Sequence, residues 1–277
     1  MIDAHHHVWR LARGDYAWLT PALAPIHRDF GLDDLAPHLA RHGIEATILV
    51  QAAPTEAETA FLLDIAERNT GVAGMVGWAN FEAPNAAERV AALAENRLLV
   101  GLRPMVQDIA DDDWLLRDDL VPALNAMVRH RLVFDALVLP RHLPPLLRVV
   151  DRHPDLSVVL DHLGKPHIAA GTLDPWRADL ARLSERPNVV CKLSGMATEA
   201  RPDWHSDDLR PYVDHLLACF GPDRIMWGSD WPVVNLAGGY DRWREAAQSL
   251  VPKAAWAAIF GGTAERIYLS NRGRARC

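Results

Sequence analysis

The sequence is poor in cysteine and has no long apolar run. Its 277 residues include three cysteines, Cys191, Cys219 and Cys277, and no CxxC pair. This argues against a disulfide framework or a thiolate zinc site and favours a reducing compartment, so we expect the thiols to be core groups. No apolar stretch reaches the roughly 18 residues of a membrane span, and no signal peptide is visible. We therefore expect a cytoplasmic protein without a membrane partner.

Basic clusters and nucleotide-binding motifs are also missing. Acidic residues outnumber basic ones by 36 to 29, and the two signs are interspersed, which argues against a nucleic-acid partner. Neither GxGxxG after the first apolar run nor GxxxxGKS/T occurs, so nucleotide binding has no support. No repeat or linker divides the chain, and 49% of its residues are hydrophobic, enough for a sizeable core. We expect one domain over residues 1–277, as a monomer or a homodimer.

What the sequence does contain is an alternation of strand-like and helix-like segments. Eight short runs rich in Val, Ile and Leu predict strands, and segments with a helical period lie between them. Mostly continuous apolar runs are typical of a parallel sheet buried on both faces. This order predicts an α/β protein with a (β/α)8 TIM-barrel fold and extra C-terminal helices, with an open doubly wound sheet as the alternative. The predicted strands are 2–7, 46–51, 72–79, 98–104, 132–138, 157–162, 188–194 and 224–230; the predicted helices are 32–42, 55–69, 84–96, 118–130, 141–153, 175–185, 206–219 and 239–250, with 252–260 and 263–270 at the C-terminus.

One end of this predicted barrel is marked by a long segment and by polar residues. Residues 10–31 are too many for an ordinary loop and are expected to cover the barrel mouth. Active sites of such barrels lie at the carboxyl ends of the strands. A buried charge is costly unless it is paired, so a paired site best explains polar residues at nearly every strand end. In strand order they are His5 and His7; Gln51; Trp78 and Asn80; Arg103 and Gln107; Asp135; Asp161 and His162; Lys192 and Ser194; Ser229, Asp230 and Trp231.

Three consecutive histidines begin this series. His5 and His7 are two residues apart, so on a strand their side chains share one face, while His6 points away from it. Such a pair is usable as two metal ligands. A purification-tag remnant is the alternative, although the run lies inside an apolar strand. We expect His6 to be a packed residue.

The other polar residues have structural alternatives that the sequence leaves open. Asp230, in GSDWP, could form a turn or a helix cap, and Lys165, in DHLGKP, could be a solvated turn residue. Lys192 could form a structural ion pair with an acidic neighbour such as Asp230. Arg103 and Asp135 could be strand-end ion pairs.

Five segments together carry a resemblance to a known family. IDAHHHVW, GLRPMVQD, VVLDHLGKP, VVCKLSG and IMWGSDWPV resemble the amidohydrolase superfamily, and within it the sugar-lactonase branch of L-fuconolactonase-like, L-rhamnonolactonase-like and dicarboxypyrone lactonase enzymes. The resemblance continues to GGTAERIY near the C-terminus. It implies a (β/α)8 fold, hydrolysis of a cyclic ester, and a site that contains His5, His7, His162 and Asp230.

The resemblance also bears on the metal. Where binuclear members carry a bridging lysine or glutamate on strand 4, this chain has Arg103, and where they carry a histidine on strand 5, it has Asp135. This implies the loss of the second metal position. We expect at most one divalent ion, zinc before others, or no metal.

Lactone hydrolysis needs an activated water, a polarised carbonyl and a proton for the departing alkoxide. Asp230 is the candidate general base, and the three histidines either bind one ion with it or donate hydrogen bonds to the carbonyl. The candidate catalytic residues are thus Asp230 and His162, with Lys192 and Arg103 supplying positive charge for the oxyanion or holding a substrate group. The partner is a small-molecule substrate, a sugar lactone or related cyclic ester. Candidate substrate contacts are Gln51, Trp78, Gln107, Asp135, Lys165, Ser194 and Trp231.

Two other functions stay open at this point. A decarboxylase of the same superfamily would need a firmly held metal and would release CO₂ instead of consuming water. A non-catalytic sugar-acid-binding protein on a decayed barrel is the second alternative, against which the intact set of strand-end residues argues. Acid release from a panel of sugar lactones separates a lactonase from both.

Overall fold

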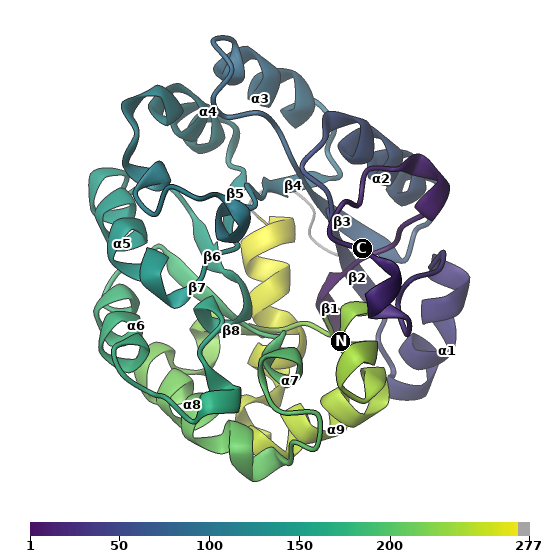
Figure 1. Cartoon of the computed structure of the whole chain (residues 1–277). Coiled ribbons are helices and arrows are strands. Elements are labelled where there is room, and N and C mark those ends of the chain that lie inside the picture. Colours follow the sequence, from purple (N-terminus) through teal and green to yellow (C-terminus); the bar gives the residue numbers. More distant parts are fainter. Residues whose placement is uncertain (271–277) are drawn as a thin grey trace.

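The computed structural model describes residues 1–270, and its centre is a barrel of eight parallel strands (Figure 1). Each strand is hydrogen-bonded to the next one along the chain, from the first to the eighth. The predicted TIM-barrel fold and all eight predicted strands are therefore confirmed. The strands are β1 (Ile2–His6), β2 (Ala46–Val50), β3 (Val72–Gly77), β4 (Leu99–Leu102), β5 (Val133–Ala136), β6 (Val158–Leu160), β7 (Val189–Leu193) and β8 (Ile225–Trp227).

The carboxyl ends of β1 and β8 are joined by backbone hydrogen bonds. His6 and Trp231 form an isolated parallel bridge. The N–H of His7 donates to the carbonyl of Trp231 at 2.7 Å, and the N–H of Asp230 donates to the carbonyl of His5 at 2.8 Å. These bonds close the barrel at this end and fix the segments that follow the first and last strands against each other.

Helices form a ring around the barrel, as Figure 1 shows. In α2 the hydroxyl of Thr55 accepts a hydrogen bond from the N–H of Glu58 and caps the helix, and Leu62 and Ala66 on one face are buried. The predicted helices are confirmed within a few residues, except that 118–130 begins with a separate single turn before α4; α7 was not predicted. The helices are α1 (Leu32–His42), α2 (Glu56–Arg68), α3 (Ala86–Ala94), α4 (Val121–His130), α5 (Leu143–Arg152), α6 (Trp176–Ser184), α7 (Met196–Glu199), α8 (Ser206–Phe220) and α9 (Gly239–Leu250).

The C-terminal segment closes the barrel at the amino ends of the strands. Figure 1 shows it, in yellow, within the ring of strands. Thr263 donates a hydrogen bond to the carbonyl of Asp223, just before β8, at 3.2 Å. Ile267 and Tyr268 share a buried cluster with inward-facing strand residues such as Val100. The predicted C-terminal helices are confirmed: residues 253–270 are helical, with π-helical stretches at Ala258–Gly262 and Glu265–Leu269 and a kink at Phe260 and Gly261.

Residues 10–31 lie over the opposite end, as predicted. The backbone of Trp9 pairs with that of Phe30 in an antiparallel bridge, which brings the two ends of the segment together. The indole N–H of Trp18 donates to the carbonyl of Ala52, just past the carboxyl end of β2, at 2.7 Å. The segment is thereby anchored across the barrel mouth.

The cysteine prediction is confirmed in part. Cys191 is fully buried in β7, whereas Cys219 is partly exposed on α8; Cys277 lies outside the described residues. Throughout residues 1–270, every helix is too short or too polar to cross a membrane.

Candidate active site

Side chains at the ends of three different strands meet at the carboxyl end of the barrel. His5 lies in β1 and His7 directly follows it, while His162 and Asp230 follow β6 and β8. The Nε2 atoms of His5 and His7 are 3.2 Å apart. Oδ1 of Asp230 lies 3.2 Å from Nε2 of His7, 3.6 Å from Nε2 of His5 and 4.0 Å from Nε2 of His162. The structure thus brings together, in a buried cluster, the residues for which the sequence predicted a metal or catalytic role.

A bulge in β1 decides which histidines face this cluster. Ala4 points into the barrel, where it packs with inward-facing valines, so strict alternation would turn His5 and His7 outward. The pairing of β1 with β2 shifts register between Asp3 and His6, and Oδ1 of Asp3 accepts the backbone N–H of His5 at 3.2 Å. Because a bulge redirects side chains, His5 and His7 both reach the site.

The middle histidine, His6, takes no part in the cluster. It is fully buried, and neither of its ring nitrogens has a hydrogen-bond partner in the described part of the chain. Burial lowers the pKa of His6 to about 3, so the ring is neutral at ordinary pH. His6 is the packed residue that the sequence led us to expect.

Local backbone geometry positions the two residues that follow β6 and β8. His162 and Asp230 have φ angles of 53° and 57°, in the left-handed region that non-glycine residues rarely adopt and that is concentrated at functional sites. Gly195 leaves the space for His162, because a Cβ there would lie 2.5 Å from Nδ1 of the imidazole. Gly228 does the same for His5, because a Cβ added at Gly228 would lie 2.5 Å from the Cβ of His5.

A hydrogen bond fixes the position of one proton on His7. Its Nδ1 lies 2.8 Å from the carbonyl oxygen of Val50, which can only accept, so Nδ1 carries the proton. In the neutral ring, Nε2 then presents its lone pair to the carboxylate of Asp230 at 3.2 Å. Two acceptors at this distance repel each other unless a proton or a cation lies between them.

The donor set fits a small divalent ion. Zinc bonded to nitrogen or oxygen at about 2.0–2.1 Å in a tetrahedron places neighbouring ligand atoms about 3.3–3.4 Å apart. The separations among His5, His7 and Asp230 are 3.2–3.6 Å. His162 lies at the edge of this set and also borders a second possible group with His5 and Asp161. Imidazole and carboxylate are ligands that zinc accepts.

A buried chain of charged groups lies directly beneath the cluster. Nζ of Lys192 is 2.5 Å from Oδ2 of Asp135, 3.0 Å from Oδ1 of Asp161 and 3.3 Å from Nδ1 of His5. The hydroxyl of Tyr268, from the C-terminal segment, donates to Oδ2 of Asp135 at 2.7 Å. This series of buried polar groups therefore connects the amino end of the barrel to the floor of the site.

Arg103 adds a second cation to this network. Its Nη1 lies 3.3 Å from Oδ2 of Asp161 and 3.3 Å from Nε2 of His5. Burial by itself raises the pKa of Asp161, but the charges of Lys192 and His5 beside it outweigh burial and hold that pKa well below its usual range. The structural ion pair that was the alternative for Lys192 is present, but its acidic partners are Asp135 and Asp161, and the suggested partner Asp230 is wrong.

A cavity of about 250 Å³ opens above the cluster. His7, His162, Asp230 and Arg103 form part of its wall, and Trp18 reaches it from the segment over the mouth. We call it the catalytic cavity. Two predicted substrate contacts, Gln107 and Lys165, line it as well; its other walls are Leu23, Ala52, Met105, Asp108, Leu137, Val233 and Leu236.

Two of the other predicted contacts hold site residues in place. Nε2 of Gln51 donates to the carbonyl of Arg103 at 2.7 Å, and Arg103 donates back to the carbonyl of Gln51. Oγ of Ser194 lies 2.8 Å from Nδ1 of His162. Both are fully buried, so they orient the side chains that reach the cavity.

The remaining predicted contacts lie away from the catalytic cavity. Asp135 lies below it with Lys192, and both are fully buried. Trp231 packs in the core with its ring centroid 5.3 Å from that of Phe30. Trp78 lines a neighbouring cavity.

Sequence reasoning gave no role to two residues of the network. Asp161 stood beside His162 at the end of a predicted strand, and its position inside an apolar run was the available signal. Tyr268 had no comparable signal, because it lies in the C-terminal helical segment far from any predicted strand end.

Comparison with known proteins agrees with this geometry. The family model described as Amidohydrolase matches residues 2–269. The chain is 45% identical to an L-fucono-1,5-lactonase from Burkholderia ambifaria, over 98% of this chain and 96% of the relative, and 40% identical to one from Burkholderia multivorans, over 96% and 95%. A crystal structure of an amidohydrolase from Burkholderia multivorans with bound zinc has a TM-score of 0.88 at 40% identity, covering 96% of this chain and 98% of that one. Because the family match spans all eight strands and the whole buried cluster, this chain belongs to the amidohydrolase family.

Proposed function

We propose that the chain hydrolyses a sugar aldono-lactone to the sugar acid, with L-fucono-1,5-lactone as the first candidate substrate. The observation that carries this proposal is the convergence of Asp230 with three histidines, all within 4.0 Å of its Oδ1, at a small cavity whose wall includes Asp230, His7 and His162. The near full-length similarity to two L-fucono-1,5-lactonases supports the same class of reaction.

In the proposed reaction, the oxygen of a water molecule bonds to the lactone carbonyl carbon and the ring C–O bond breaks. Burial raises the pKa of Asp230, but the imidazoles around it lower that pKa by more. The net pKa is below its usual value, so the carboxylate is ionised at neutral pH. Asp230 accepts a proton from the water and returns it to the departing ring oxygen. One water is consumed, and the new carboxylic acid releases one proton at neutral pH.

Two cations on the cavity wall would stabilise the oxyanion. Arg103 and Lys165 both line the cavity, and a fixed positive charge at a developing oxyanion lowers the barrier. Lys192 does not line it, so we assign Lys192 an indirect role through its contact with Nδ1 of His5. His162, also on the wall, is a candidate hydrogen-bond donor to the substrate.

We further propose that the cluster holds a single divalent ion, zinc before others. His5, His7 and Asp230 would bind it, and His162 borders the same position. When bound, such an ion would polarise the lactone carbonyl and acidify a water. A single ion is favoured because the Lys192 ammonium lies within 3.0 Å of both Asp135 and Asp161, and a second cation there would be repelled.

The experiment is a pH-indicator assay of L-fucono-1,5-lactone and a panel of aldono-1,4- and 1,5-lactones, against enzyme-free blanks and with and without chelator. We expect acid release from at least one lactone, and no more than one divalent ion per chain in elemental analysis of the purified protein. Absence of acid release from every lactone would contradict the proposed reaction. Two ions per chain would contradict the single-ion proposal.

A further inference from the structure

A second cavity lies beside the catalytic cavity at the barrel mouth. Its volume is about 260 Å³, against about 250 Å³ for the catalytic cavity. Met105 and Asp108, just past β4, line both cavities. Each alone is smaller than the roughly 300–1,000 Å³ of ordinary small-molecule sites. Because Met105 and Asp108 belong to both walls, the two cavities adjoin. One ligand could extend from the first into the second past the flexible side chain of Met105.

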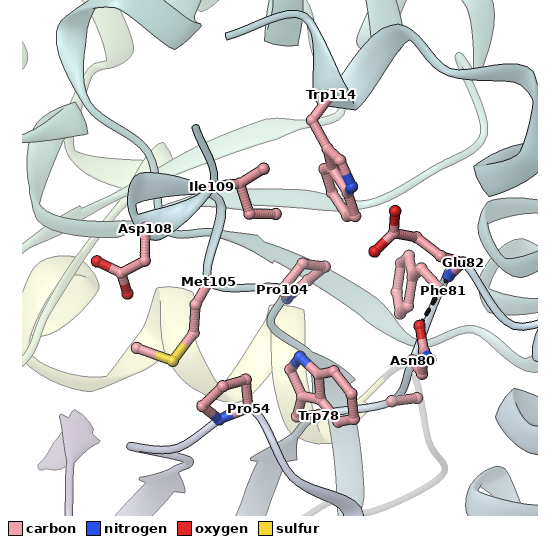
Figure 2. A pocket seen from close by; sticks show the side chains of 11 residues that line it. Pro54, Trp78, Asn80, Phe81, Glu82, Pro104, Met105, Asp108, Ile109 and Trp114 are labelled. Carbon is pink, nitrogen blue, oxygen red and sulfur yellow. Dashed lines mark hydrogen bonds between the residues drawn. The ribbon is translucent and has the colours of Figure 1, made fainter. Parts of the chain in front are cut away.

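The wall of this second cavity includes three aromatic rings and two prolines. They come from the loops that follow β2, β3 and β4. Figure 2 shows Trp114 on one side and Trp78 on the other, with Phe81 at one end and Pro104 between them. Indole faces pack well against the C–H face of a sugar ring, since both surfaces are flat and apolar and both carry polar groups at their edges.

One polar group in the wall lacks a partner. Trp114 is only 4% exposed, and its Nε1 has no hydrogen-bond partner among residues 1–270. A buried indole N–H normally finds an acceptor. Figure 2 shows this nitrogen on the side of the ring that faces Glu82, whose Oε1 already accepts from Arg117 at 2.6 Å. The nitrogen is enclosed in this structure, so a ligand oxygen would satisfy the indole donor once the exposed Glu82 side chain moves aside.

The charges at the rim restrict the kind of ligand. The carboxylates of Glu82 and Asp108 both line the cavity, so an anionic group would be repelled. Each is already engaged, Glu82 by Arg117 and Asp108 by the amide of Gln107 at 3.3 Å, so neither demands a cation. Hydroxyl groups can donate to these carboxylates and accept from the indole N–H. A neutral, hydroxylated ring satisfies all of these conditions.

We propose that the second cavity is a subsite for a second sugar ring, joined through a glycosidic bond to the lactone ring in the catalytic cavity. The substrate class is then the lactone of a disaccharide acid. This inference rests on the proposed lactonase function and extends it. The second ring stacks on Trp78, and one of its oxygens accepts the N–H of Trp114.

The test compares D-glucono-1,5-lactone with its 4-O-glycosyl derivatives, cellobiono-, maltobiono- and lactobiono-1,5-lactone, with L-fucono-1,5-lactone as the reference substrate. We expect kcat/KM of the wild-type enzyme to be higher for at least one disaccharide lactone than for D-glucono-1,5-lactone. Trp78→Ala should remove that advantage by about tenfold through KM, with kcat unchanged, because truncating an aromatic contact removes binding shared by ground and transition states. Activity on L-fucono-1,5-lactone should not change.

Two further variants isolate the cause. Trp114→Phe keeps an aromatic ring and removes the N–H, so it should raise KM for the disaccharide lactone several-fold and leave the reference reaction unchanged. Trp256→Phe is the matched control, because Trp256 lines neither cavity and should affect no substrate. Thermal unfolding of each variant checks that the fold is retained.

Three outcomes would overturn the subsite. They are turnover of L-fucono-1,5-lactone with none of any disaccharide lactone, an equal effect of Trp78→Ala on one-ring and two-ring substrates, and a wild-type preference for the one-ring lactone. Failure to hydrolyse any lactone, including L-fucono-1,5-lactone, would instead contradict the proposed function and with it the subsite.

Discussion

The two halves of the barrel mouth differ in how their polar groups are held. At β1, β6, β7 and β8, ionisable side chains are fully or nearly fully buried, and His5, Asp161 and Lys192 lie within 3.5 Å of one another. In the loops that follow β2, β3 and β4 beyond Arg103, the wall carries three aromatic rings, and the ion pair at the rim, Glu82 with Arg117, has side chains 45% and 41% exposed. We call these the charged half and the aromatic half.

The difference follows from the cost of burying a charge. A buried ion stays in a fold only when neighbours replace the water it has lost, so each member of the charged half is tied to another. An exposed pair keeps its water and contributes little. The charged half is therefore expected to be sensitive to single substitutions in both activity and stability, and the aromatic half mainly in recognition.

The largest effect is expected at Asp230. Asp230→Asn keeps the shape of the side chain but removes the proton acceptor, so turnover of the lactone should fall by about 10²–10⁴-fold, the usual contribution of a general base. Initial rates in the indicator assay measure this, with thermal unfolding as the check on folding. Asp241→Asn, in α9 and outside the cluster, is the matched control. Near-wild-type turnover by Asp230→Asn would remove Asp230 from its assigned role.

The next effect concerns stability. Lys192→Met leaves the carboxylates of Asp135 and Asp161 without their shared ammonium, and removing one partner of a buried ion pair typically costs about 3–5 kcal/mol. We expect a loss of this size in the free energy of unfolding, measured by urea denaturation. Adding Asp135→Asn to Lys192→Met should recover part of it. A single variant as stable as wild type would show that the charged half is not held together in this way.

A smaller effect is expected where the network reaches the C-terminal segment. Tyr268→Phe removes one hydroxyl that donates to Asp135 at 2.7 Å, and a hydrogen bond to a charged group contributes about 1.5–3 kcal/mol. Urea denaturation should show a loss in this range. Unchanged stability would mean that the tyrosine hydroxyl adds nothing to the hold on Asp135.

The smallest effect is expected in the aromatic half. Glu82→Gln removes the charge of an exposed ion pair, which contributes little in water because solvent screens it. We expect no measurable change in the free energy of unfolding, under the same denaturation conditions as for Lys192→Met. A loss comparable to that of Lys192→Met would abolish the distinction between the two halves.

The extent to which the sequence predicted the site depended on how local each signal was. The barrel followed from apolar runs and helical periodicity, which involve neighbouring residues. Gathering the strand-end residues at one end followed from the general position of active sites in such barrels, and the choice of His5, His7, His162 and Asp230 among them followed from the family resemblance. The contacts of Lys192 could not be predicted, because Asp135 lies 57 residues away along the chain. Separation along the chain gives no basis for choosing between Asp135 and Asp230 as the partner of Lys192.

Substrate contacts were the least predictable part. Gln51, Ser194 and Trp231 end or follow strands as Gln107 does, yet Gln107 lines the catalytic cavity and the other three are fully or nearly fully buried. Position at a strand end sets the height of a residue in the barrel. Whether its side chain reaches the cavity or a neighbouring side chain depends on packing between strands.

The sequence by itself determined the order of strands and helices and the residue types available at the barrel mouth, since hydrophobic periodicity acts over a few residues. Only the tertiary structure decided which way those residues point. The HHH run shows the reason, because alternation counted from Ala4 would turn His5 and His7 outward. The bulge that turns them inward exists only in the pairing of β1 with β2, and the space for His5 exists only because Gly228 lies against it.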